Sequence, residues 1–244
     1  MSMPVQSELS NRLFSHLSPG DFQLLAPHLS KVALPKGFSI AEPDQPIEHV
    51  YFPETGVFSM VAVSPEGQQV EAGLIGPEGV APTALILGAE STPNRINAQI
   101  PGDSWRVEQA AFSTILEGSA SFRRLMQRFV QTLIVQTTYT ALSNAVHPIE
   151  ERLARWLLMC DDRVASGELA LTHEFMSVML AVRRPSVTTA LHVLEGNGFI
   201  SAQRGCVVIR NRTAMEQFAG DSYGKPEASY NLLIGEMRTP PQAR

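Results

Sequence analysis

The spacing of hydrophobic and polar positions changes along this 244-residue chain, and each change predicts a different kind of element. Residues 9–29 hold two short apolar stretches separated by Ser18-Pro19-Gly20, a pattern that predicts short helices. Over residues 30–108, short apolar runs recur between turns that contain proline and glycine, such as Ser64-Pro65-Glu66-Gly67. Regularly spaced short strands of this kind are typical of an all-β roll or barrel. The first part of the chain is therefore expected to be a β-roll preceded by helices.

A long helix is predicted over residues 119–146, which contain neither proline nor glycine. Apolar side chains recur there at steps of three and four residues, so that they lie near one face of the helix. We interpret this face as the pairing surface of a symmetric homodimer, with a helix that covers the β-roll as the alternative. The candidate dimerisation residues are Phe122, Leu125, Met126, Phe129, Leu133, Gln136 and Thr140.

Two helices joined by a tight turn are predicted further along the chain, after His147-Pro148 ends the long helix. Thr172 is a suitable N-cap for the first of the two. The second begins near Pro185, because proline fits the first turn of a helix and disrupts its interior. It ends at Gly196 and Gly198. Such a pair of helices with inward apolar residues is a helix-turn-helix.

A β-hairpin is predicted directly after these helices, from two short β-rich runs at 199–202 and 206–210, and it makes the unit a winged helix. The exposed face of the second helix begins with Arg183 and Arg184, and arginine can contact guanine O6 and N7 together. In DNA-binding units of this kind, the second helix enters the major groove with its N-terminal residues toward the bases. The candidate DNA-binding residues are Arg183, Arg184, Ser186, Thr188, Thr189, His192 and, at the wing tip, Arg204.

Charge and composition support this interpretation locally. The whole chain has a net charge of −5, yet the segment from Phe175 to Arg212 holds five arginines and one acid, Glu195, so its charge is about +4. No apolar run approaches the roughly 20 residues of a membrane span, and the N-terminus has no pattern of a secretory signal. The two cysteines have no ligand spacing, which indicates a reducing compartment. We therefore expect a cytoplasmic protein that binds double-stranded DNA and no membrane.

The main alternative is a small-molecule-binding or cupin-like metal-enzyme roll with a helical accessory domain. Metal chemistry of that kind needs two or three histidines and a carboxylate at close spacing, and the roll offers His49 with Glu48 and Glu54 nearby. The chain also has no nucleophile elbow, P-loop or dinucleotide-binding glycine motif. We predict no enzyme activity, no metal and no cofactor. A third alternative, a winged helix that binds protein instead of DNA, is disfavoured by the arginines.

The order of these parts, with EERLARWLLMCDDR and LTHEFMSVMLAVRRPSVTTALHVLEGNGFISAQRGCVVI, resembles the Crp/Fnr superfamily of bacterial transcription regulators. The resemblance implies an α+β fold and a homodimer that reads a palindromic site, with RNA polymerase as a further candidate partner. It places Arg184 on the main base-contacting arginine, whereas Ala181, Pro185 and Thr189 depart from the usual residues. The implied domains are a sensor β-roll related to cyclic-nucleotide-binding domains with N-terminal helices (1–118), a central dimerisation helix (119–146), a winged helix-turn-helix (147–219) and a C-terminal tail (220–244).

The resemblance also bears on the signal that the roll would sense. A gap-free count places Ala81-Pro82 and Thr92-Pro93 where cyclic-nucleotide-binding members carry the residues that hold the ribose and phosphate. A buried phosphate without a paired charge is costly, so we expect no cyclic-nucleotide binding. The candidate effector-binding residues are Arg95, as a substitute cation, and Thr137 and Thr138, at positions that touch the purine in such members. Cys160 and Cys206 are interpreted as structural, and the effector stays unidentified.

Overall fold

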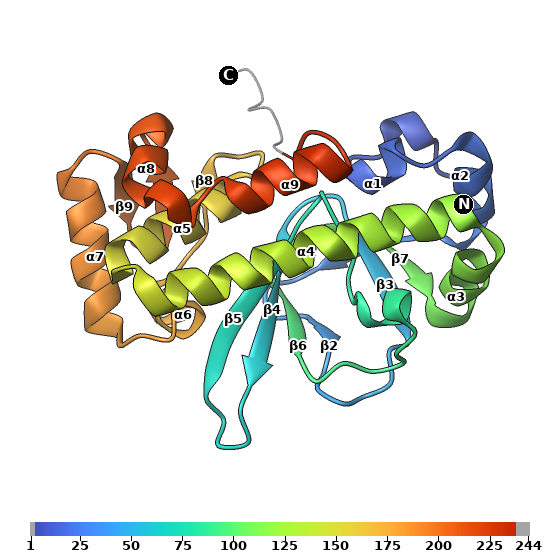
Figure 1. The fold of residues 1–244 in the computed structure, drawn as a ribbon, viewed down its shortest axis with the longest axis horizontal. Coiled ribbons are helices and arrows are strands. Elements are labelled where there is room, and N and C mark those ends of the chain that lie inside the picture. Colours follow the sequence, from blue (N-terminus) through green and yellow to red (C-terminus); the bar gives the residue numbers. More distant parts are fainter. Residues whose placement is uncertain (1–2, 238–244) are drawn as a thin grey trace.

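Two antiparallel sheets form the N-terminal roll in the computed structural model, which describes residues 3–237 (Figure 1). One sheet has the strand order β1-β7-β3 and the other the order β2-β6-β4-β5. The β-roll that the turn spacing predicts is confirmed. The strands are β1 (Ser30–Leu34), β2 (Ser39–Ala41), β3 (His49–Pro53), β4 (Val57–Val63), β5 (Gln69–Ile75), β6 (Arg95–Ile100) and β7 (Gly102–Glu108).

The turn between β4 and β5 shows why proline and glycine positions in the sequence predict turns. Gly67 has a φ of +82°, a left-handed conformation that glycine adopts without steric cost. The backbone amide of Ser64 donates to the carbonyl of Gln68 at 2.8 Å and closes the hairpin. Strands β4 and β5 then pair along their length, from Phe58 with Ile75 to Val63 with Gln69.

Short helices pack on the roll at its N-terminal end. Ser18 caps the second of them by accepting a hydrogen bond from the amide of Asp21, as expected for a helix that begins at Ser-Pro-Gly. Phe14 and Leu25 are fully buried in the core of the roll. The helical elements of this part are η1 (Gln6–Glu8), α1 (Arg12–Ser15), α2 (Pro19–Leu25), η2 (Ala26–His28), η3 (Ala84–Leu87) and α3 (Gln109–Gly118).

The long helix α4 (Ala120–Val146) runs along most of the length of the molecule (Figure 1). Ser119 caps its start, and His147 leaves the helical conformation at its end. The Gln136 side chain makes two hydrogen bonds to the backbone of the roll. Its nitrogen donates to the carbonyl of Leu74 at 3.2 Å, and its oxygen accepts from the backbone amide of Leu74 at 2.6 Å. A Cβ on Gly73 would come within 3.0 Å of the Gln136 oxygen, so glycine allows this close approach.

The expected dimerisation face of α4 lies inside one protomer, which corrects our interpretation of it. Its members from Phe122 to Gln136 are at most 8% exposed, and they pack on the roll or on the C-terminal helix. Thr140 is half-buried and accepts a hydrogen bond from Arg155. The periodicity correctly marks a buried face, but the roll itself covers it. The residues concerned are Phe122, Leu125, Met126, Phe129, Leu133, Gln136 and Thr140.

The C-terminal part is a winged helix-turn-helix, as predicted. Its small sheet has the strand order β8-β10-β9. Methionine, leucine and valine side chains of the helices form its core. The elements are α5 (Ile149–Asp161), β8 (Glu168–Leu169), α6 (His173–Met179), α7 (Arg184–Gly196), β9 (Ile200–Gln203), β10 (Cys206–Ile209) and α8 (Arg212–Ala219).

The tail folds back onto the roll. After η4 (Gly220–Ser222), helix α9 (Lys225–Leu233) lies beside α4 (Figure 1). The Tyr230 hydroxyl donates to the carbonyl of Glu78 at 2.7 Å, and Met237 joins the core of the roll. Residues 238–244 of the predicted tail lie outside the described residues. None of the helices in residues 3–237 has both the length and the apolar character that crossing a membrane requires.

The roll and the winged helix share a hydrophobic core, although the chain changes direction at residues 147–148. Val57, Val61, Leu74 and Ile100 of the roll belong to the same buried cluster as the apolar residues of α5, α6 and α7. Polar pairs lie in this contact as well, because Arg163 donates to the carboxylate of Glu78 at 2.8 Å with both side chains almost fully buried. The two parts are therefore packed together rather than joined by a free hinge.

Candidate nucleic-acid interface

The turn between α6 and α7 is intact, although alanine stands where glycine is usual. Thr172 caps α6 by accepting from the amide of Phe175 at 3.2 Å, as predicted. Ala181 then takes a φ of +50°, a left-handed conformation that is unfavourable for a residue with a Cβ. The amide of Val182 donates to the carbonyl of Ser177 at 3.0 Å and closes the turn.

Arg183 is the N-cap of the second helix α7, and Arg184 is its first helical residue. Pro185 follows in the first turn of α7. An amide hydrogen at this position would have no carbonyl partner within the helix, so proline causes no loss of a hydrogen bond there. The inward face of α7 matches the prediction, since its buried residues are Val187, Ala190, Leu191 and Leu194. The polar residues of the helix therefore face outward, with the two arginines at the leading end.

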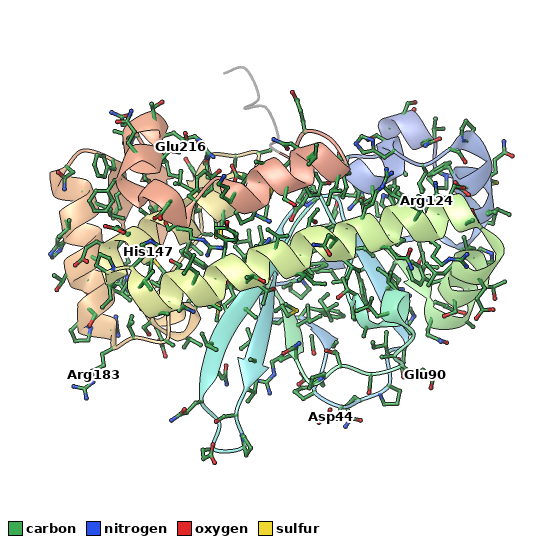
Figure 2. The ribbon with its side chains drawn as sticks, in the orientation of Figure 1. Asp44, Glu90, Arg124, His147, Arg183 and Glu216 are labelled. Atoms are coloured by element: carbon green, nitrogen blue, oxygen red, sulfur yellow. The ribbon has the colours of Figure 1, made fainter. Side chains whose placement is uncertain are left out.

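Five of the seven candidate DNA-binding residues are exposed, namely Arg183, Arg184, Thr189, His192 and Arg204. Figure 2 shows the Arg183 side chain pointing away from the protein. Within residues 3–237, the ion pairs involve neither this arginine nor Arg184 or Arg204, so these three cations are available to a ligand.

The other two candidates are less accessible. Ser186 is half-buried, and so is Thr188. The Thr188 hydroxyl donates to the carbonyl of Arg184 and lies 3.1 Å from a ring nitrogen of His173. These contacts tie Thr188 to its own domain, and we place it at the edge of the candidate surface.

Arg204 at the wing tip is exposed, whereas Arg212 after the wing forms ion pairs inside the domain. Gly205 has a φ of +77° in the β9–β10 turn, next to the exposed Arg204. Arg212, which the local charge count included, is instead bound by Asp161 and Asp162, each at 2.6 Å. It also contacts the Tyr223 hydroxyl at 2.6 Å, so its role is structural. The exposed positive charge is therefore concentrated at the start of α7 and at the wing tip.

Comparisons with known proteins agree with this geometry. Residues 151–218 match the family described as the Crp-like helix-turn-helix domain. A candidate Crp/Fnr-family transcriptional regulator from Eubacterium rectale ATCC 33656 has a similar structure, with a TM-score of 0.66 and 18% identity over 85% of this chain and 97% of that one. FixK2 from Bradyrhizobium japonicum gives a TM-score of 0.65 and 21% identity over 78% of this chain and 96% of FixK2. Residues 151–218 therefore belong to the Crp-like helix-turn-helix family, and the chain shares its fold with these Crp/Fnr-family structures.

A third structure extends the likeness in fold to another Crp/Fnr-family member. TTHA1359, a transcriptional regulator from Thermus thermophilus, gives a TM-score of 0.64 at 17% identity over 78% of this chain and 98% of TTHA1359. No curated protein sequence matches the chain. Together, the family match and these structures confirm the α+β architecture and the helix-turn-helix that we predicted from the Crp/Fnr resemblance.

The candidate effector-binding residues of the roll and α4 are engaged in separate local contacts. Arg95 forms a surface ion pair with Glu42 at 3.2 Å. The hydroxyls of Thr137 and Thr138 each donate to a carbonyl of their own helix at 2.9 Å, and Thr138 is exposed. The binding of an effector by these three residues stays a prediction that nothing in their arrangement supports.

The surroundings of the histidines and cysteines give no sign of a metal site or a reactive thiol in the described residues. The described residues contain no group of three or more His, Cys, Asp or Glu that could hold a metal ion. Cys160 is fully buried, and burial raises the pKa of its thiol well above the usual value, so the thiol stays protonated. Cys206 is half-buried, and both cysteines are free.

Sequence reasoning missed the charged residues in the contact between the roll and the winged helix. Glu71 is 4% exposed and Glu78 is 2% exposed, and each contacts a side chain of the C-terminal part. The sequence does hold one signal for Glu71, because an acid within the apolar run VEAGLI is unusual for a buried strand. Its partner could not be identified from the pattern.

Proposed function

We propose that this chain is a cytoplasmic transcription regulator that binds a palindromic DNA site as a homodimer. The observation that carries the proposal is the exposed, unpaired pair Arg183 and Arg184 at the leading end of α7, in a domain of the Crp-like helix-turn-helix family. FixK2 and TTHA1359 share the fold, and TTHA1359 is named as a transcriptional regulator. An enzymatic role has no comparable support.

The positions of the side chains suggest how they contact DNA. Arg184 lies at the first helical position, so its guanidinium can reach guanine O6 and N7 as α7 enters the major groove. Arg183 and the positive end of the helix then lie near the phosphates that flank the groove. Thr189 and His192 follow at steps that keep them on the outward face. Arg204 reaches a neighbouring phosphate from the wing.

A second face of α4 supports the pairing of two copies. A series of exposed residues follows alternating steps of three and four along the helix, which is the spacing of a coiled-coil seam. Ile134 is 52% exposed, and Leu142 beside the seam is 45% exposed. Small and uncharged side chains around them allow a second helix to approach closely. The seam consists of Gln127, Gln131, Ile134, Thr138, Ala141 and Ala145.

The experiment that tests this proposal is a selection of bound duplexes from a random pool with the purified full-length chain. We expect an inverted repeat whose half-sites lie about 34 Å apart, one turn of DNA, because a two-fold dimer presents two copies of α7. Binding to the selected duplex should weaken steeply as the salt concentration rises. Recovery of unrelated sequences without an inverted repeat would contradict the proposal.

A further inference from the structure

A buried carboxylate lies where the roll meets the two helices that support α7. Glu71 of β5 accepts a hydrogen bond from the Ser59 hydroxyl of β4 at 2.6 Å. Its second oxygen accepts from the indole nitrogen of Trp156 in α5, also at 2.6 Å. The Ser59 oxygen lies 3.3 Å from the sulfur of Met179, the last residue of α6. These contacts connect β4 and β5 of the roll with α5 and α6 of the winged helix.

This contact lies next to the elements that orient α7. Met179 precedes the turn that begins at Leu180 and Ala181, and it is 5% exposed. The ring of Trp156 lies 6.2 Å from the ring of Phe175, so α5 is also in contact with α6. A displacement at Glu71 would shift the end of α6 and, through the turn, the direction of α7.

We infer that Glu71 is a positioning residue for DNA binding: in its protonated form it holds the helix-turn-helix on the roll, and loss of its proton loosens that contact and weakens DNA binding. This inference rests on the proposed DNA-binding function. The carboxylate touches no DNA, so its effect is expected to act through Trp156 and Met179.

Burial is the main reason why this group titrates near neutral pH. Burial raises the pKa of Glu71 from 4.5 to about 7, against the opposing effect of its hydrogen bonds and of Arg155 and Arg163. The other titratable group of α5 that interacts with it is the thiol of Cys160, which stays neutral. Ser59 of β4, which contacts Glu71, and Met179 of α6, which contacts Ser59, carry no charge.

The sign of the effect follows from solvation. An ionised Glu71 is more stable in water than in the contact, so the packed arrangement is favoured below pH 7 and weakened above it. The packed arrangement leaves Arg183, Arg184 and His192 exposed. It therefore presents an open DNA-binding face in a fixed orientation, which lowers the entropy that binding must remove.

The first test uses no DNA. The chain has two tryptophans, so Trp105→Phe leaves Trp156 as the reporter. We expect the Trp156 emission of this variant to titrate with a midpoint near pH 7, and we expect that transition to vanish when Glu71→Gln is added. A flat profile in the first variant, or an unchanged transition in the second, would overturn the inference. Circular dichroism at each pH establishes that both variants are folded.

The second test measures affinity for the selected duplex between pH 5.5 and pH 8.5, in the parent and in Glu71→Gln. The ratio of the two dissociation constants should be close to one at the acidic end. It should reach roughly tenfold in favour of Glu71→Gln at the alkaline end. Any pH effect on DNA binding that does not involve Glu71 is common to both proteins and cancels in the ratio. The control is Glu117→Gln, an exposed acid of α3.

The two tests separate the possible failures. Strong DNA binding with a ratio that does not change with pH would overturn the role of Glu71 and leave the proposed function standing. An absence of DNA binding in every variant would contradict the proposed function, and the fluorescence of Trp156 would then still decide whether Glu71 controls the packed arrangement.

Discussion

Replacement of Glu71 by glutamine should make the protein more stable at alkaline pH, which is unusual for a substitution at a residue that is 4% exposed. The pKa of Glu71 is raised from 4.5 to about 7 by burial, so the folded protein holds this proton more tightly than the unfolded chain does. Stability therefore falls as the pH rises from about 4.5 to 7, and this loss is complete above that range.

The magnitude follows from the same shift. One pKa unit corresponds to about 1.4 kcal/mol, so ionised Glu71 lowers the free energy of unfolding by roughly 3 kcal/mol at pH 8. Glutamine keeps both hydrogen bonds without a charge, since its oxygen accepts from Trp156 and its amide donates to Ser59. Glu71→Gln should therefore unfold at a higher urea concentration than the parent at pH 8, and at nearly the same concentration at pH 5.

A second buried glutamate provides the matched control. Glu78 is paired with Arg163 at 2.8 Å, and both side chains are almost fully buried. Glu78→Gln leaves the arginine without its charged partner, so it should destabilise the protein by about 3–5 kcal/mol at pH 8. If Glu71→Gln were also less stable than the parent at pH 8, the hydrogen bonds and the nearby arginines would outweigh burial, and our reasoning on Glu71 would be refuted.

Three further predictions concern the surface of the molecule. Arg184→Ala should weaken binding to the selected duplex by about 1–3 kcal/mol in an electrophoretic mobility assay, whereas Arg95→Ala on the roll should not; equal affinities of the Arg184 variant and the parent would remove it from the base contacts. Ile134→Glu should convert the proposed dimer to monomers in sedimentation velocity, whereas Leu232→Glu should leave that dimer intact, although Leu232 is 85% exposed on α9; the reverse result would place the proposed contact on α9. Ala181→Gly should stabilise the protein by about 1 kcal/mol in urea unfolding, because φ is +50° there, and a loss of stability would show that the turn is not strained.

The helix-turn-helix could be predicted in detail because its boundaries depend on local chemistry. The cap at Thr172 and the helix start at Arg184-Pro185 follow from backbone rules that hold without knowledge of the rest of the fold. The same is true of the β4–β5 hairpin at Gly67. These caps and turns depend only on residues that are close together in the chain, so a single sequence is enough to predict them.

A sequence pattern can show that one face of a helix is buried, but it does not show what covers that face. The spacing of Phe122, Met126 and Phe129 indicates that one face of α4 is buried, but the roll and a second copy would require the same pattern. The structure assigns that face to the roll, through contacts between residues far apart in the sequence. Glu71 illustrates the same limit, because Trp156, its partner, lies in another domain and nothing near either residue marks the pair.

Strand β5 connects the two halves of the molecule, and this position restricts how a signal could pass between them. Helix α4 binds the backbone of Leu74 through Gln136, and helix α5 binds the side chain of Glu71 through Trp156. The bend at residues 147–148 lies between these two helices, so the winged helix cannot swing about it without breaking at least one of the contacts on β5. A signal in the roll would therefore have to change the contacts of β5 with α4 or α5 in order to move the winged helix.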